Sequence, residues 1–181
     1  MPLLVVLLAC DTGADSGPGE SGAPGCFDRE PSVTVGGSGV DAEGRPIWVE
    51  MPEGSEQTMV HGPQGGWHLL ASADVRSMEE IVSLEYTVEW PARGDVEISH
   101  GMFRVMLVAN AERCGGVYAG MFGVLDVSGL AVEEADTPPE LLGGEELRIR
   151  MEATDGSGRS ASDSRTVRAA LDPVDQADTG A

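Results

Sequence analysis

Two segments of the chain alternate strictly between apolar and polar residues. In residues 80–90, every second residue from Val82 to Trp90 is apolar, and the residues between them are Ser, Glu and Thr. Residues 146–155 repeat the pattern, with apolar residues at the odd positions from 147 to 153. In an extended chain, a period of two places successive side chains on opposite faces. Each segment is therefore predicted to be a β-strand with one buried face.

Shorter apolar runs separated by turn residues extend this pattern over most of the chain. The sequence Asp155-Gly156-Ser157-Gly158 suits a hairpin turn, and residues 52–55 and 92–95 are further turn candidates. Single helical turns are expected within 77–82 or 133–142. Many short strands with turns at this spacing predict an all-β fold, an immunoglobulin-like or fibronectin-like antiparallel β-sandwich of about 8–10 strands. The other expected strands are 32–35, 47–51, 57–61, 67–75, 96–99, 103–108, 118–127 and 159–170.

The ends of the chain differ from this central part. Residues 3–9 are all apolar, but a membrane-spanning helix needs roughly 20 such residues, so residues 1–9 are predicted to be a secretory signal. Because no Lys or Arg precedes the apolar run, we expect the natural start to lie upstream. Residues 10–25 are rich in Gly, Ser and Pro and are predicted to be a flexible linker. The sandwich domain is expected over 26–171, followed by a disordered tail over 172–181.

The apolar run ends in Leu7-Leu8-Ala9-Cys10. These four residues resemble a lipobox, the signal that precedes the lipidated cysteine of bacterial lipoproteins. The resemblance implies that Cys10 is lipidated and that the protein is exported to the cell envelope and anchored to the inner or outer membrane. A flexible linker directly after Cys10 fits a domain held away from a membrane surface.

Two further segments carry resemblances. The final predicted hairpin, residues 147–167, is similar to the closing strands of bacterial immunoglobulin-like and fibronectin-like modules. The run Gly62-Pro63-Gln64-Gly65-Gly66-Trp67-His68 resembles a loop of bacterial lipoproteins that have an immunoglobulin-like β-sandwich domain and no assigned activity. These resemblances imply a fold and a location, with no activity attached.

The cysteine count agrees with export. The chain has three cysteines, and lipidation of Cys10 would leave Cys26 and Cys114 as a pair. An oxidising envelope compartment permits a disulfide between them. Two free buried thiols are the alternative.

Charge narrows the choice of partners. The formal net charge is −20, and all positive charges are arginines. Such a charge repels nucleic acid and anionic lipid headgroups. It favours solubility, cationic partners or divalent ions, so we expect an unidentified protein or small-molecule partner besides the membrane anchor.

Catalytic motifs are not recognisable in the sequence. It contains no Gly-x-Ser-x-Gly, phosphate-binding glycine loop or His-Glu-x-x-His. Asp-Thr-Gly occurs at 11–13 and 178–180, but both triplets lie in polar ends, whereas an aspartic protease presses its two aspartates together in a rigid apolar setting. We therefore expect a binding or structural module and no enzyme.

The glycine-rich loop is the strongest candidate for a site. If His61 opposes His68 across a hairpin, the two imidazoles share one face and would form a platform for Cu or Zn. His100 and Met102, at another expected turn, would complete it, as would Glu97, with Met51, Met59 and Met106 as further soft ligands. A register one residue different puts the histidines on opposite faces. In the structural alternative, which we expect, Gln64 and His68 form hydrogen bonds with the loop backbone and Trp67 packs on the sandwich edge.

Overall fold

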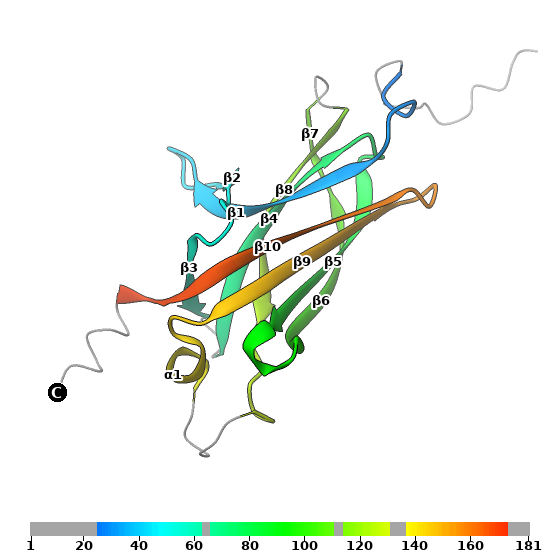
Figure 1. Cartoon of the computed structure of the whole chain (residues 1–181). Helices are drawn as coiled ribbons and strands as arrows, with labels where there is room; N and C mark the ends of the chain where they lie inside the picture. Colours follow the sequence, from blue (N-terminus) through cyan, green and yellow to red (C-terminus); the bar gives the residue numbers. More distant parts are fainter. Residues whose placement is uncertain (1–24, 63–65, 111–113, 131–136, 174–181) are drawn as a thin grey trace, which may run out of the picture.

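The structure is a computed structural model that describes residues 25–62, 66–110, 114–130 and 137–173. In this part of the chain the secondary structure is almost entirely β (Figure 1). The strands are β1 (Ser32–Val40), β2 (Pro46–Glu50), β3 (Glu56–His61), β4 (Trp67–Arg76), β5 (Ile81–Trp90), β6 (Val96–Met106), β7 (Val108–Asn110), β8 (Gly115–Val124), β9 (Glu146–Asp155) and β10 (Ser160–Leu171). A 3-10 turn, η1 (Pro91–Arg93), and one short helix, α1 (Pro138–Leu142), interrupt them.

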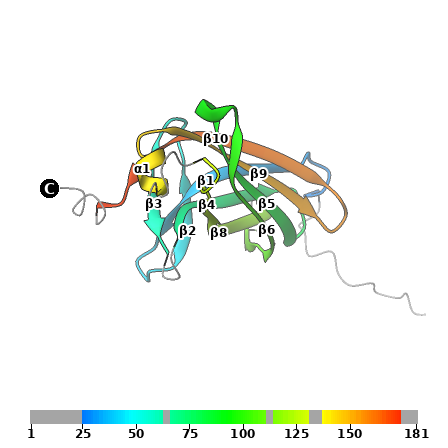
Figure 2. The ribbon, with the colours of Figure 1, turned by 90° about the horizontal axis from the view of Figure 1, so that it is seen from below.

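The strands form two layers that are joined into one curled sheet. One layer has the order β1-β4-β8-β7, with β2 on the outer edge of β1, and the other has the order β3-β10-β9-β5-β6. Seen from below, β9 and β10 lie across from β2, β4 and β8 (Figure 2). This is the strand order of an immunoglobulin-like sandwich, so the predicted fold class is confirmed.

One pairing departs from the expected antiparallel arrangement. Strand β3 pairs with β10 in parallel through its first residues and with β4 in antiparallel through its last. It therefore passes from one layer to the other and joins them into a single curled sheet.

A search of the described residues for an apolar helix of membrane-spanning length finds none.

The core lies between the layers, where the alternating segments place their apolar faces. The alternating apolar residues from Val82 to Trp90 in β5 and from Leu147 to Ala153 in β9 are at most 3% exposed, as their pattern predicts. Tyr86 is the largest fully buried side chain, and its hydroxyl donates to the carbonyl oxygen of Leu69 over 3.3 Å. The opposite strand makes room for this ring with Gly123, because a Cβ there would overlap Tyr86 Cε1 and Ser99 Oγ.

Two local expectations are corrected, and a third is confirmed. Residues 96–99 and 103–108, expected as two strands, belong to the single strand β6 up to Met106. Residues 77–82 form no helical turn, since Ser77 has φ 56° and its N–H donates to the carbonyl oxygen of Cys114. The expected helix within 133–142 is α1, capped by Thr137 and Glu140, while 131–136 lie outside the described residues.

The expected turns are present. Residues 92–95 connect β5 to β6 through η1, with Gly94 in the left-handed region. Residues 156–159 connect β9 to β10.

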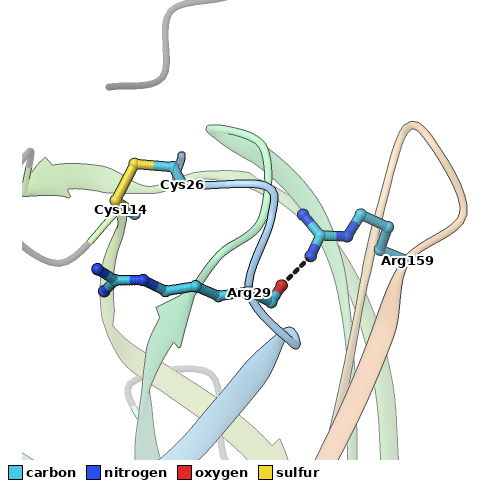
Figure 3. Close-up of a disulfide and its surroundings, with 4 residues drawn as sticks. All are labelled: Cys26, Arg29, Cys114 and Arg159. Atoms are coloured by element: carbon cyan, nitrogen blue, oxygen red, sulfur yellow. Dashed lines mark hydrogen bonds between the residues drawn. A yellow bond between two sulfur atoms is a disulfide. The ribbon is translucent and has the colours of Figure 1, made fainter. Parts of the chain in front are cut away.

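The predicted disulfide is confirmed. Cys26 and Cys114 are bonded, with their Cα atoms 5.1 Å apart and 88 positions apart in the sequence. The bond ties the segment that precedes β1 to the start of β8 (Figure 3). Beside it, the Arg159 guanidinium donates to the Arg29 carbonyl oxygen, which attaches the β9–β10 turn to the same segment (Figure 3).

The β9–β10 turn is organised around the buried carboxylate of Asp155. Its Oδ1 accepts hydrogen bonds from Ser157 N, Ser157 Oγ and Arg159 N over 3.1, 2.8 and 2.9 Å. Burial alone would raise the pKa of Asp155, but these hydrogen bonds and one from Glu79 N outweigh it, so the pKa lies below its ordinary value.

We expect Asp155→Asn to melt at a lower temperature than the wild type at pH 7. Because the folded-state pKa is depressed, the carboxylate stabilises the fold above its unfolded-state pKa of about 4, and this contribution disappears as the pH falls through the folded-state value. Thermal unfolding followed by circular dichroism between pH 7 and 3 should show the two melting temperatures converging on acidification. A constant difference across this range would contradict the assignment.

Candidate functional site

The hairpin between β3 and β4 carries the glycine-rich loop, and its register decides between the two alternatives for His61 and His68. His61 is paired with Trp67, and His68 is paired with Val60. Adjacent pairs in a ladder face opposite sides of the sheet. The two imidazoles therefore point away from each other, and the shared face that the metal alternative needs does not form.

Each histidine of the hairpin instead contacts an aromatic ring. The rings of His61 and Trp67 lie 4.8 Å apart, and Trp67 packs partly against the core. The His68 ring meets Phe122 edge-on at 5.4 Å, and a Cβ on Gly62 would overlap its Nε2. The backbone closes the loop through a hydrogen bond from Gly62 N to Gly66 O over 3.0 Å. Pro63, Gln64 and Gly65 lie outside the described residues.

His100 lies on a different strand, on the outer face of β6. Its Nε2 lies 3.3 Å from Glu85 Oε1, and its Nδ1 lies 3.5 Å from Glu97 Oε1. Met102, two residues further along β6, is 70% exposed and is paired with Glu85 across the ladder. The carboxylates of Glu85 and Glu97 therefore lie beside different nitrogens of the His100 ring.

The ligand set of the metal alternative is therefore not assembled among the described residues. His61, His68 and His100 lie in three separate settings, and Met51 and Met59 are buried in the core. Within the part of the chain that the structure describes, no group of three or more His, Cys, Asp or Glu side chains is placed to hold a metal ion.

A pocket that the sequence did not indicate lies at the edge between the two layers. It has a volume of about 360 Å³ and opens where β1 faces β10 and the chain leaves β2. A volume of this size suits a small organic molecule or one large side chain. The lining residues are Thr34, Val35, Trp48, Glu50, Met51, Pro52, Glu53 and Arg165.

The floor of the pocket is apolar and fixed. Val35 and Met51 are buried core residues. The indole of Trp48 lies over Gly36, where any Cβ would overlap Trp48 Nε1. Trp48 Nε1 is buried and has no hydrogen-bond partner. The ring occupies space that is free only because β1 has a glycine, with no side chain, at this position.

The wall formed by the β2–β3 connection is fastened to β10 by the backbone. Gly54 N donates to Thr166 O over 2.7 Å, and Arg168 N donates to Ser55 O over 2.9 Å. The Glu53 carboxylate accepts a hydrogen bond from Thr166 N over 3.2 Å. These bonds hold a negative charge at the rim in a defined position before any ligand arrives.

The side chains that line the pocket carry more negative than positive charge. Arg165 is the one cation among the lining residues, and its Nη1 already bonds Asp163 Oδ1 over 2.9 Å and Ser164 O over 2.8 Å. The other oxygen of Asp163 accepts from Val35 N over 2.9 Å. Because Asp163 balances Arg165, the carboxylates of Glu50 and Glu53 leave the pocket negative.

Comparison of the chain with protein-family models gives no match, and comparison with curated proteins finds no similar sequence.

Proposed function

We propose that this protein is an exported lipoprotein of the cell envelope whose β-sandwich domain binds a ligand in the pocket between β1, β2 and β10. The lipid is attached to Cys10, and the acyl chains anchor the protein to the inner or outer membrane. The domain acts by binding, with no chemical step.

The observation that supports the lipid anchor is the pairing of two of the three cysteines in a disulfide. The disulfide accounts for Cys26 and Cys114, and Cys10 is the third cysteine of the sequence. Its position after a short apolar run and before a polar linker supports lipidation, and a disulfide supports an oxidising compartment.

The pocket supports the binding part of the proposal. A preformed concave site with an apolar floor and a few fixed polar groups is the usual form of a ligand site. Here the floor is Trp48 with Val35 and Met51, and the fixed polar group is the Glu53 carboxylate bonded to β10.

We expect Cys10→Ser, expressed with its native upstream region in a bacterium, to move the protein from the membrane fraction to the soluble fraction. Two acyl chains hold a protein stably in a bilayer, and the variant has no site for them. Fractionation and metabolic labelling with a radioactive fatty acid measure the result.

The matched control replaces Cys26 and Cys114 by serine together, which leaves no free thiol in the domain and keeps Cys10 in place. It should remain labelled and membrane-bound. Unchanged membrane association of Cys10→Ser would end the lipoprotein proposal.

A further inference from the structure

We infer that the pocket between β1, β2 and β10 binds an organic cation, an ammonium or guanidinium group carried on an apolar stem. This deepens the proposed binding function and rests on it. The inference does not depend on the lipid anchor.

The first support is the combination of an aromatic floor with an acidic rim. A cation over the face of an indole ring is attracted by the π electrons, and Trp is the strongest of the aromatic side chains in this interaction. Trp48 supplies this ring in the pocket, and Glu50 and Glu53 supply carboxylates at the rim. An apolar stem would pack on Trp48 and Pro52, which line the pocket and keep part of their surface exposed.

The second support is preorganisation. The Trp48 ring is seated on Gly36, and Glu53 is bonded to the β10 backbone. Neither group needs to be ordered when a ligand enters, so little conformational entropy is lost on binding.

The third support is the balance of charge, both in the pocket and over the whole chain. Arg165 would attract an anion, but Asp163 already neutralises its charge through the 2.9 Å contact. The chain carries a net charge of −20, and a negative field concentrates cations at an acidic concave site. An anionic ligand would meet two uncompensated carboxylates at the rim.

The chemistry fits a free amine or guanidine, and equally the Lys or Arg side chain of a protein partner. The probes therefore include both forms. Butylguanidine represents the free molecule, and a capped Gly-Gly-Arg-Gly-Gly peptide represents the side chain. The same peptide with citrulline in place of arginine keeps the shape and removes the charge.

The test is calorimetric titration of the full chain, purified in detergent if it is membrane-bound. We expect saturable binding of butylguanidine or of the arginine peptide at concentrations up to about 10 mM, and binding at least tenfold weaker for the citrulline peptide. Binding should weaken as salt is raised, because the rim carboxylates are exposed. Tighter binding of the peptide assigns a protein partner, and tighter binding of butylguanidine assigns a free molecule. Either order supports the inference.

Variants locate the binding in this pocket. Glu50→Gln and Glu53→Gln should each weaken binding about threefold, and the double variant about tenfold. Gly36→Ala should also weaken binding, because it displaces Trp48 without removing a charge. The matched control is Glu152→Gln, which removes one exposed carboxylate on β9. Glu152 is paired with Ser162. Arg165, which lines the pocket, lies three residues further along β10 and so on the other face of the strand, which places Glu152 on the side of the sheet away from the pocket.

Three results would overturn the inference in protein that circular dichroism shows to be folded. The first is no saturable binding of either cation, and the second is equal binding of the citrulline peptide. The third is an equal loss of affinity in Glu152→Gln and in Glu50→Gln. None of these results bears on the anchoring experiment with Cys10→Ser, so failure of the ligand assignment is distinguishable from failure of the lipoprotein proposal.

Discussion

Replacing both Cys26 and Cys114 by serine is expected to lower the free energy of unfolding by about 4–5 kcal/mol. The disulfide closes a segment of 88 residues, and breaking it frees the unfolded chain to adopt many more conformations. Domains of this size have total stabilities of about 5–15 kcal/mol. The variant should therefore be marginally stable at 25 °C, and urea unfolding followed by tryptophan fluorescence measures the loss.

The double replacement avoids a free thiol that would form bonds between molecules, and Cys10→Ser should be present in both proteins for the same reason. Reduction of the otherwise intact protein should reproduce the loss. A urea midpoint that changes by less than the equivalent of about 1 kcal/mol would contradict the expected role of the bond.

Gly123→Val is expected to destabilise the domain by about 3 kcal/mol or more, and Gly123→Ala by about 1–3 kcal/mol. A Cβ at this position would overlap the ring of Tyr86 and the hydroxyl of Ser99. The ring has no room to withdraw, since Tyr86 is fully buried and bonded to Leu69. Thermal and urea unfolding measure the effect.

The control is Gly129→Ala, where an added Cβ would contact no atom within 4 Å. It should change the stability by less than about 0.5 kcal/mol. A second test combines Gly123→Ala with Tyr86→Leu, which removes the overlapping ring atom. In that background Gly123→Ala should be less destabilising than in the wild type. Equal costs in both backgrounds would show that the ring is not the obstacle.

The parts of the fold that follow from local pattern were predictable from the sequence. Strict alternation identified β5 and β9 and assigned the correct face to the core, because burial of one face of a strand imposes a period of two. The turn at Asp155 was recognisable because its glycines and its carboxylate act on neighbouring residues.

Glycines that serve distant contacts were misinterpreted. Gly101 suggested a turn between two strands, but β6 continues through it, and a Cβ there would contact the Phe103 ring at 2.8 Å. The first strand was expected to end at Val35, yet β1 runs to Val40 through Gly36 and Gly37. These glycines lie beneath Trp48 and Val49 of β2, a contact that no local rule reveals.

Contacts between distant residues also determine the candidate site, which is why the sequence did not reveal it. A change of one residue in the register of the β3–β4 hairpin decides whether His61 and His68 share a face. The pocket depends on β10 lying beside the β2–β3 connection, more than a hundred residues earlier in the chain. The available signal was a glycine-rich strand followed closely by a strand that contains tryptophan, which predicts that a large ring lies over small residues.

The position of the disulfide also determines how the domain responds to mechanical tension. A pull on the chain from the N-terminal side reaches the fold at Cys26. Without the bond, the force would open the β1–β4 ladder from Ser32 onward, one residue pair at a time. With the bond, the load passes to Cys114 and into β8, which is paired with both β4 and β7. The force is then shared across several strands at once, and β1 keeps its place above the pocket while the chain ahead of it is under strain.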